Sequence, residues 1–129
     1  MRVLEVGQVL VHERCFTDED VVAFQRISGD GGRHHAQPDA TGRRIVHGLL
    51  TASIATKIGG DLDYWAREMI FEFRRPVFTG DTIRCTLTIV ELVPESGRVG
   101  LTMVGACHDQ HGKEVLRIST RGVVLDDAS

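Results

Sequence analysis

Two residues in a short glycine-rich segment have the types and the spacing to act together as an acid and a base. Residues 28–35 read Ser-Gly-Asp-Gly-Gly-Arg-His-His, which places the carboxylate of Asp30 five residues before the imidazole of His35. A carboxylate and an imidazole that hold one water between them can move protons to and from it. The addition of water to a double bond, or its removal, needs such a pair. The spacing therefore indicates an enzyme with acid–base chemistry.

Each member of this pair also has an ordinary structural explanation. Asp is common in turns because its side chain accepts hydrogen bonds from nearby backbone amides, so Asp30 could serve only the turn. Glycine-rich loops often carry an exposed histidine without a function, and His34 is a second imidazole beside His35. The spacing favours His35, but the residue types alone leave both explanations open.

The elements that must position the pair are visible in the surrounding sequence. Thr17 and Asp20 form a predicted capping box that begins a short helix, and Gly29 ends this helix. Residues 29–44 are polar, glycine-rich and contain Pro38, which predicts a loop. The pair is therefore expected on a loop directly after a helix.

A long helix and a sheet are predicted after this loop. Residues 45–58 are apolar on nearly every side, which is typical of a buried helix, and Gly59-Gly60 is expected to end it. Apolar and polar residues then alternate, which predicts strands. With a first strand near residues 9–16, these segments give about five antiparallel strands, near residues 69–73, 83–89, 99–103 and 114–125. Such a sheet leaves a strand edge and an apolar face that a second copy would cover, so we expect a homodimer.

Three motifs of the chain resemble one family. They are Ser28-Gly29-Asp30 with His35, then Ile45-Val46-His47-Gly48-Leu49-Leu50, and finally Phe73-Arg74-Arg75-Pro76-Val77 with Gly80-Asp81. Over residues 17–89 the chain resembles the MaoC-like (R)-specific enoyl-CoA hydratases and dehydratases, which have the hotdog fold. The resemblance implies an α+β hotdog fold in a single domain, residues 1–129, with an antiparallel sheet of about five strands wrapped around one long buried helix.

Two departures from the family pattern both fall on the substrate-facing loop. The family usually has Asn-Pro two and three positions after the Asp, where this chain has Gly32 and Arg33, and the segment between His35 and His47 is several residues shorter. Neither departure removes the pair. The resemblance thus implies an enzyme that interconverts trans-2-enoyl-CoA and (R)-3-hydroxyacyl-CoA. In it Asp30 and His35 hold the water, with Asp30 as the base and His35 as the proton donor to C2, and no metal or cofactor is needed beyond coenzyme A as part of the substrate.

The start of the predicted long helix supplies further candidates for the substrate. Gly48 stands in the first turn, where backbone N–H groups lack partners and carry the positive end of the helix dipole. A thioester oxygen could approach a glycine closely and be stabilised there, although Gly48 could instead pack against a strand. His47 is expected to fix the helix start rather than to act on substrate. Ser53 could reach the site, or its hydroxyl could bond a backbone carbonyl.

Four arginines are candidates for the phosphates of coenzyme A, because guanidinium groups match phosphate oxygens. They are Arg43, Arg44, Arg74 and Arg75. Arginines on a surface are more often simply solvated, and that alternative stays open for each of them.

Composition excludes several other classes of protein. The chain has 129 residues, 42% hydrophobic residues and a net charge of -3, which are ordinary values for one soluble domain and give no support to nucleic-acid binding. No continuous apolar run suggests a signal peptide or a membrane span, so a cytoplasmic location is expected. Three widely spaced cysteines argue against a disulfide framework and against a zinc site.

Two rival functions share the same fold. A hotdog acyl-CoA thioesterase often carries an acidic residue within the central helix, and residues 45–58 contain none, which disfavours this alternative. A non-catalytic acyl-CoA-binding hotdog subunit is the other alternative, because the altered loop with Gly32 and Arg33 could have lost turnover.

Overall fold

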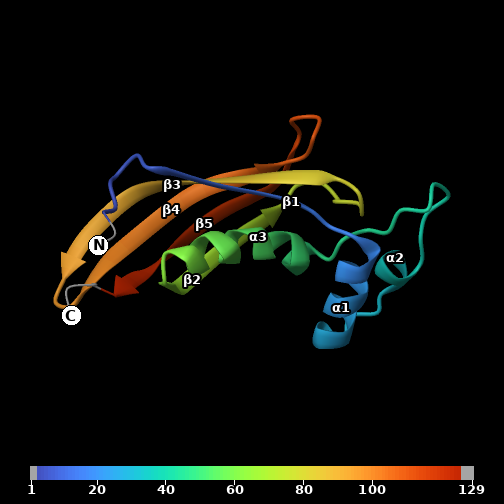
Figure 1. Ribbon diagram of the computed structural model, residues 1–129, viewed down its shortest axis with the longest axis horizontal. Helices are drawn as coiled ribbons and strands as arrows, with labels where there is room; N and C mark the ends of the chain where they lie inside the picture. Colours follow the sequence, from blue (N-terminus) through green and yellow to red (C-terminus); the bar gives the residue numbers. More distant parts are fainter. Residues whose placement is uncertain (1–2, 126–129) are drawn as a thin grey trace.

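The structure is a computed structural model that describes residues 3–125, a five-stranded antiparallel sheet that arches over one long helix (Figure 1). The elements are, in chain order, β1 Val9–Cys15, α1 Asp18–Ser28, α2 Arg33–Ala36, α3 Gly48–Asp61, β2 Tyr64–Phe73, β3 Thr82–Glu95, β4 Arg98–His108 and β5 Glu114–Leu125. The strand order is β1-β3-β4-β5-β2, so β1 and β2 are the edges. The predicted α+β arrangement of five strands around one helix is confirmed.

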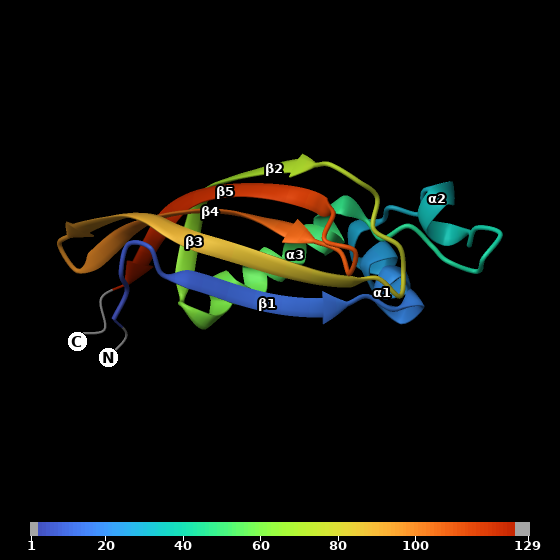
Figure 2. The ribbon, with the colours of Figure 1, turned by 90° about the horizontal axis from the view of Figure 1, so that it is seen from above.

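The core lies between α3 and the concave face of the sheet. Alternate residues of the central strands point inward, as the period of two requires. Ile83, Cys85, Leu87 and Ile89 of β3 are all at most 1% exposed. On α3, Ile54 is 1% exposed and is part of the same core cluster. Seen from above, α1 and α2 lie at one end of the sheet rather than on its face (Figure 2), so the loop that joins them stands beside the start of α3.

The long helix differs from its prediction at both ends. It begins at Gly48 rather than near residue 45, because Ile45 forms a β-bridge with Phe78 and the amide of Val46 donates to the carbonyl of Val77. These tertiary bonds hold the residues before Gly48 in an extended conformation. The helix also continues through Gly59, which is buried beside Tyr64, and ends at Asp61.

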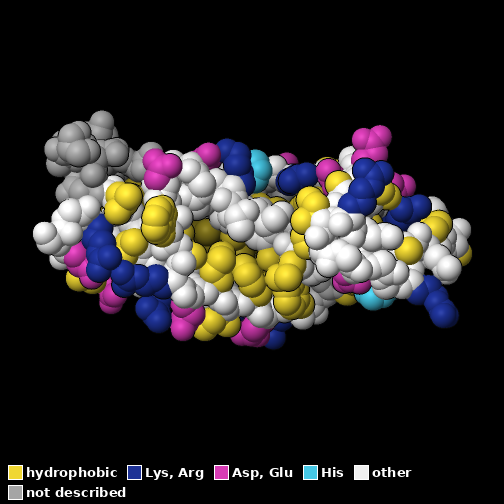
Figure 3. Space-filling view, turned by 90° about the horizontal axis from the view of Figure 1, so that it is seen from below, with side chains coloured by type: hydrophobic (Ala, Val, Ile, Leu, Met, Phe, Trp, Pro, Cys, Tyr) yellow, Lys and Arg dark blue, Asp and Glu magenta, His cyan; other side chains and the backbone are white. Residues whose placement is uncertain are grey.

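One face of α3 is open, contrary to the prediction of a helix buried on all sides. Leu49 is 62% exposed, and Thr56 and Lys57 are exposed further along the same helix. Figure 3 shows the molecule from below, the side on which α3 lies, and hydrophobic side chains are gathered across the centre of this face. None of the helices within residues 3–125 is long and apolar enough to cross a membrane.

The predicted capping box of α1 is confirmed. The hydroxyl of Thr17 accepts from the amide of Asp20 at 3.2 Å, and the carboxylate of Asp20 accepts from the amide of Thr17 at 2.9 Å. Gly29 ends α1 in the left-handed conformation with φ of 76°. The following segment is not all loop, because residues 33–36 form the short helix α2.

Candidate active site

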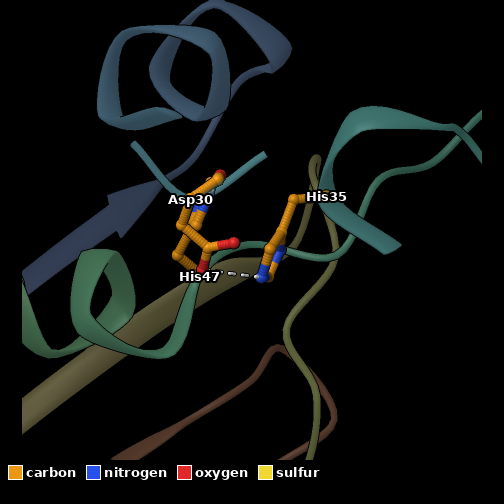
Figure 4. Close-up of side chains that lie close together, drawn as sticks. All are labelled: Asp30, His35 and His47. Atoms are coloured by element: carbon orange, nitrogen blue, oxygen red, sulfur yellow. Dashed lines mark hydrogen bonds and ion pairs between the residues drawn. The ribbon is translucent and has the colours of Figure 1, made fainter. Parts of the chain in front are cut away.

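The two residues singled out by their spacing face each other between α1 and α2. Asp30 follows the glycine that ends α1, and His35 lies on α2. Oδ2 of Asp30 is 3.7 Å from Nε2 of His35, and Figure 4 shows the two side chains directed toward one another. The imidazole is 6% exposed and the carboxylate 52% exposed, so the pair joins a buried ring to a group that solvent can reach.

The orientation of His35 is fixed by its other nitrogen. Nδ1 lies 2.7 Å from the carbonyl oxygen of Ile45, and a carbonyl can only accept, so Nδ1 carries a hydrogen and donates it. The other ring nitrogen, Nε2, is the one that faces Asp30. A water in contact with both Nε2 and Oδ2 would have a proton acceptor or donor on either side.

Asp30 is held in its ionised form. Its Oδ1 accepts a hydrogen bond of 3.0 Å from the amide of Gly32, and this bond is the largest influence on the pKa of Asp30. Desolvation acts in the opposite direction, but electrostatic interactions with His35, His47 and His34 add to the effect of the amide, so that the pKa lies below its usual value. An ionised carboxylate is the state that accepts a proton from water.

A cavity of about 310 Å³ lies beside the pair and brings together distant parts of the sequence. His34 and His35 of α2, Gly48 and Thr51 of α3, and Phe73 at the end of β2 all line it. Gly48 is the first residue of α3, so its N–H is one of the helix-end donors that have no intrahelical partner. A Cβ at Gly48 would lie only 2.8 Å from the ring of Phe73, so any larger residue here would displace that ring.

Two residues that the sequence placed among the substrate contacts make other contacts. Ser53 is not among the lining residues, and its hydroxyl donates to the carbonyl of Leu50 at 2.5 Å, which was the alternative left open. His47 is only 2% exposed and does not line the cavity either. Its Nε2 donates to the backbone carbonyl of Asp30 at 2.9 Å, and its ring stacks on His35 with 3.8 Å between centroids.

The four candidate arginines separate into two groups. Arg43 pairs with Asp39 at 3.3 Å and stacks over the ring of Phe78, and neither Arg43 nor Arg44 lines the cavity. Arg74 and Arg75 do line it. Arg74 is ion-paired with Glu72 and Glu114.

Of the two arginines at this cavity, Arg75 is the one without an ion pair among the described residues. Its guanidinium donates to the carbonyl oxygen of Glu114 at 2.7 Å, and within residues 3–125 it has no carboxylate partner. Arg75 is therefore the arginine best able to bind a phosphate of a ligand that enters here.

Asp30, His35 and His47 could in principle share a metal ion, because one ligand atom of each lies within 4.8 Å of the others. The rings of His35 and His47 are nearly parallel, with an interplanar angle of 18°, so their nitrogen lone pairs run side by side and do not converge on one point. Nε2 of His47 is also engaged with the carbonyl of Asp30. The geometry suits proton transfer better than coordination of a metal.

Comparisons with known proteins agree with this fold. No family model matches the chain. The 3-hydroxybutyryl-CoA dehydratase of Methylorubrum extorquens is 32% identical over 123 residues, which cover 88% of this chain and 75% of the relative. The (R)-specific enoyl-CoA hydratase of Rhodospirillum rubrum is 28% identical over 102 residues, covering 71% of this chain and 70% of the relative. The structure of the unliganded R-hydratase PhaJ1 from Pseudomonas aeruginosa superimposes with a TM-score of 0.83 at 25% identity, covering 96% of this chain and 84% of that one.

A five-stranded sheet around a central helix, with a carboxylate and an imidazole beside the start of that helix, defines a hotdog-fold protein of the hydratase type. With the identity and coverage just given, the chain belongs to the MaoC-like (R)-specific enoyl-CoA hydratase/dehydratase family.

Sequence reasoning did not find the whole wall of the cavity. Phe73 was expected in a strand and as part of a family motif, without a role at the site, and Thr51 and Val115 were not singled out. These residues come from three different elements, so no local spacing connects them. The alternation along residues 69–73 was the available signal that Phe73 points to the α3 side.

Proposed function

We propose that this protein interconverts trans-2-enoyl-CoA and (R)-3-hydroxyacyl-CoA by adding or removing one water. The observation that carries the proposal is the facing pair Asp30 and His35, 3.7 Å apart. His35, but not Asp30, is among the residues that line the cavity, together with Gly48, the first residue of α3. Membership of the hydratase and dehydratase family supports the reaction type.

In the proposed hydration, the thioester oxygen accepts a hydrogen bond from the amide of Gly48. A water lies between Oδ2 of Asp30 and Nε2 of His35. Asp30 takes one proton from the water while the oxygen of the water forms a bond to C3. The negative charge that develops on the thioester oxygen is stabilised at the start of α3. The protonated Nε2 of His35 then donates to C2. Transfer of the proton from Asp30 to His35 restores the pair, and dehydration follows the same steps in reverse.

Loss of enoyl absorbance with crotonyl-CoA tests the reaction directly. Asp30→Asn and His35→Ala should each slow hydration by roughly 10²–10⁴-fold, the usual contribution of a general acid or base. The double variant should lose little more than either single one, because the two groups act as a unit on one water. His34→Ala is the comparison and should stay within several-fold of wild type. Near-wild-type turnover of folded Asp30→Asn would refute the assignment.

The rival functions predict different products. A thioesterase would release free thiol from acyl-CoA without forming a chiral alcohol, and a non-catalytic acyl-CoA-binding subunit would bind enoyl-CoA without any turnover. The only acidic residue on α3 is Asp61 in the last turn, where it is ion-paired with Lys57 at 2.7 Å. It lies about three and a half turns beyond Gly48, which disfavours a catalytic base on this helix.

Coenzyme A is the proposed carrier, with Arg75 and secondarily Arg74 as phosphate contacts at the cavity. Arg75→Gln should raise KM for crotonyl-CoA and leave KM for crotonyl-pantetheine, which lacks the nucleotide phosphates, nearly unchanged. Equal effects on both substrates would assign Arg75 another role.

The proposed assembly is a homodimer formed along β2. This edge strand has ten residues, and Trp65, Ile70 and Phe73 on it are each more than half exposed. A long apolar edge with unpaired backbone groups is the kind of surface that a second copy covers. Phe73 also lines the cavity, so the dimer would shield one wall of the site.

A further inference from the structure

His47 contacts both members of the proposed acid–base pair although it lies outside the cavity. Its Nε2 donates to the backbone carbonyl of Asp30 at 2.9 Å, and its ring lies 3.8 Å from that of His35 at an angle of only 18°. Figure 4 shows the three side chains gathered at one point between α1, α2 and the start of α3. A residue 17 positions after Asp30 thereby joins the two groups to the beginning of the long helix.

We propose that His47 is a positioning residue that sets the distance and the relative orientation of Asp30 and His35. The inference rests on the proposed hydratase function, because it concerns the same pair. Between Asp30 and His35 the chain contains Gly31 and Gly32, which give the backbone wide conformational freedom. The hydrogen bond from His47 fixes the backbone on one side of this glycine segment, and the stacked ring fixes the imidazole plane on the other.

The polar contacts of His47 identify the hydrogen bond as the reason for a histidine here. The carbonyl of Asp30 can only accept, so Nε2 of His47 carries a hydrogen. Nδ1 of the same ring is buried and has no hydrogen-bond partner within residues 3–125. A buried polar atom without a partner is destabilising. An apolar ring would fill the same space without a buried, unpartnered nitrogen. The hydrogen bond to Asp30 is therefore the contact that offsets the destabilisation caused by Nδ1.

His34 provides a matched comparison within the same site. Its ring also lies 3.8 Å from that of His35, but it is exposed and lines the cavity, and it donates no hydrogen bond to Asp30. Removing His34 therefore removes a ring contact and one side chain of the cavity wall, and it leaves the hydrogen bond to Asp30 in place. Removing His47 removes the ring contacts with His35 and Phe24 and also the hydrogen bond to Asp30.

Three substitutions separate the hydrogen bond of His47 from its ring contacts. Gln keeps a donor near the position of Nε2 without the ring, Phe keeps the ring without the donor, and Ala keeps neither. Because a displacement of about 1 Å in a catalytic group can lower the rate about 10²-fold, we expect His47→Ala to lower kcat for crotonyl-CoA hydration by about that factor, with KM changed less than about threefold. His47→Gln should recover at least about tenfold of the loss, and His47→Phe should recover less.

The same substitutions in an Asp30→Asn background test whether His47 acts through the pair. If it does, His47→Ala should cost no more than several-fold there, because the pair is already inactive. The inference would be overturned if His47→Ala lowered kcat by the same factor in both backgrounds, or if it raised KM and left kcat unchanged. It would also be overturned if His47→Phe recovered more activity than His47→Gln.

A measurement on the wild-type protein distinguishes failure of this inference from failure of the proposed function, and it does not depend on any variant folding. Long-range ¹H–¹⁵N NMR of the histidine side chains should find the hydrogen of neutral His47 on Nε2 and that of neutral His35 on Nδ1. A hydrogen on Nδ1 of His47 would overturn the inference even if the enzyme is active. Opposite tautomers in a protein that hydrates no enoyl-CoA would keep the geometric link and refute the hydratase function.

Discussion

Replacing Gly48 by Ala separates the stability of the helix start from its proposed role in binding the thioester. The new Cβ would lie 2.8 Å from one ring carbon of Phe73, closer than real contacts allow, so the ring must turn. Phe73 is 55% exposed and can move toward solvent, at a cost of about 0.5–1.5 kcal/mol if the ring leaves its preferred rotamer. The better helix propensity of Ala offsets about 0.8–1 kcal/mol of this. The net change in stability should be within about 1 kcal/mol, a shift of only a few degrees in Tm.

The activity of Gly48→Ala should fall far more than its stability. The amide remains, but the methyl group occupies the space through which the thioester oxygen approaches it, and loss of one oxyanion donor lowers kcat by about 10²–10³-fold. We expect about 10²-fold in crotonyl-CoA hydration. Gly60→Ala is the control, because Gly60 lies in the same helix, is exposed and would place its Cβ in open space. A folded Gly48→Ala enzyme with wild-type kcat would refute this placement of the substrate.

Three further outcomes are expected. Asp39 accepts hydrogen bonds from the Thr41 hydroxyl and the Arg43 amide, which lower its pKa from 3.8 to about 2. A lowered pKa stabilises the fold above the unfolded value of 3.8, and this stability is lost as pH falls through about 2. Asp39→Asn should therefore lower Tm more at pH 7 than at pH 2, and an equal difference at both pH values would contradict this explanation. A thiol reagent such as DTNB should react with Cys15 alone in the native protein and also with Cys85 and Cys107 after unfolding, because only Cys15 is exposed. Light scattering at micromolar concentration should give about twice the chain mass of 14.2 kDa, or a multiple of that, and a monomer would exclude the dimer along β2.

The features that the sequence predicted well are those determined by near neighbours in the chain. Asp30 and His35 are five residues apart on one turn and one short helix, so their types and spacing suffice to bring them together. The capping box of Thr17 and Asp20 is likewise complete within one helical turn. Strand alternation succeeded because each central strand has one face against α3 and one face outward.

The features that the sequence missed depend on residues distant in the chain. Ile45 and Val46 have the apolar character of the helix that follows, but bonds to Phe78 and Val77 hold them extended, so α3 starts later. Gly59 looked like a helix stop, yet the backbone there is buried beside Tyr64 of the next strand. In each case a tertiary contact overrides the local preference, and no pattern within the segment records it.

The link from His47 to Asp30 could not be predicted for the same reason. A histidine immediately before a helix is expected to cap that helix, but His47 makes no side-chain capping bond. Its donor is directed to the carbonyl of a residue 17 positions earlier. Only the arrangement of α1, α2 and α3 at one end of the sheet brings those atoms within reach (Figure 2).

The structural role of Asp30 in the turn is compatible with its proposed catalytic role, because its two carboxylate oxygens have different partners. Oδ1 accepts from the amide of Gly32 at 3.0 Å, while Oδ2 faces Nε2 of His35 at 3.7 Å. Asp30→Asn should keep the turn, since an amide oxygen can replace Oδ1, but it cannot accept a proton from water. Asp30→Ala removes both partners.

The two variants should therefore be equally slow in hydration and unequal in stability, with Asp30→Ala melting at a lower temperature than Asp30→Asn. Thermal unfolding and crotonyl-CoA turnover measured on the same preparations give both comparisons. If the two variants melt together, the bond to Gly32 contributes nothing to the fold. If Asp30→Asn is clearly faster than Asp30→Ala, the carboxylate acts through the turn that it holds rather than by taking a proton.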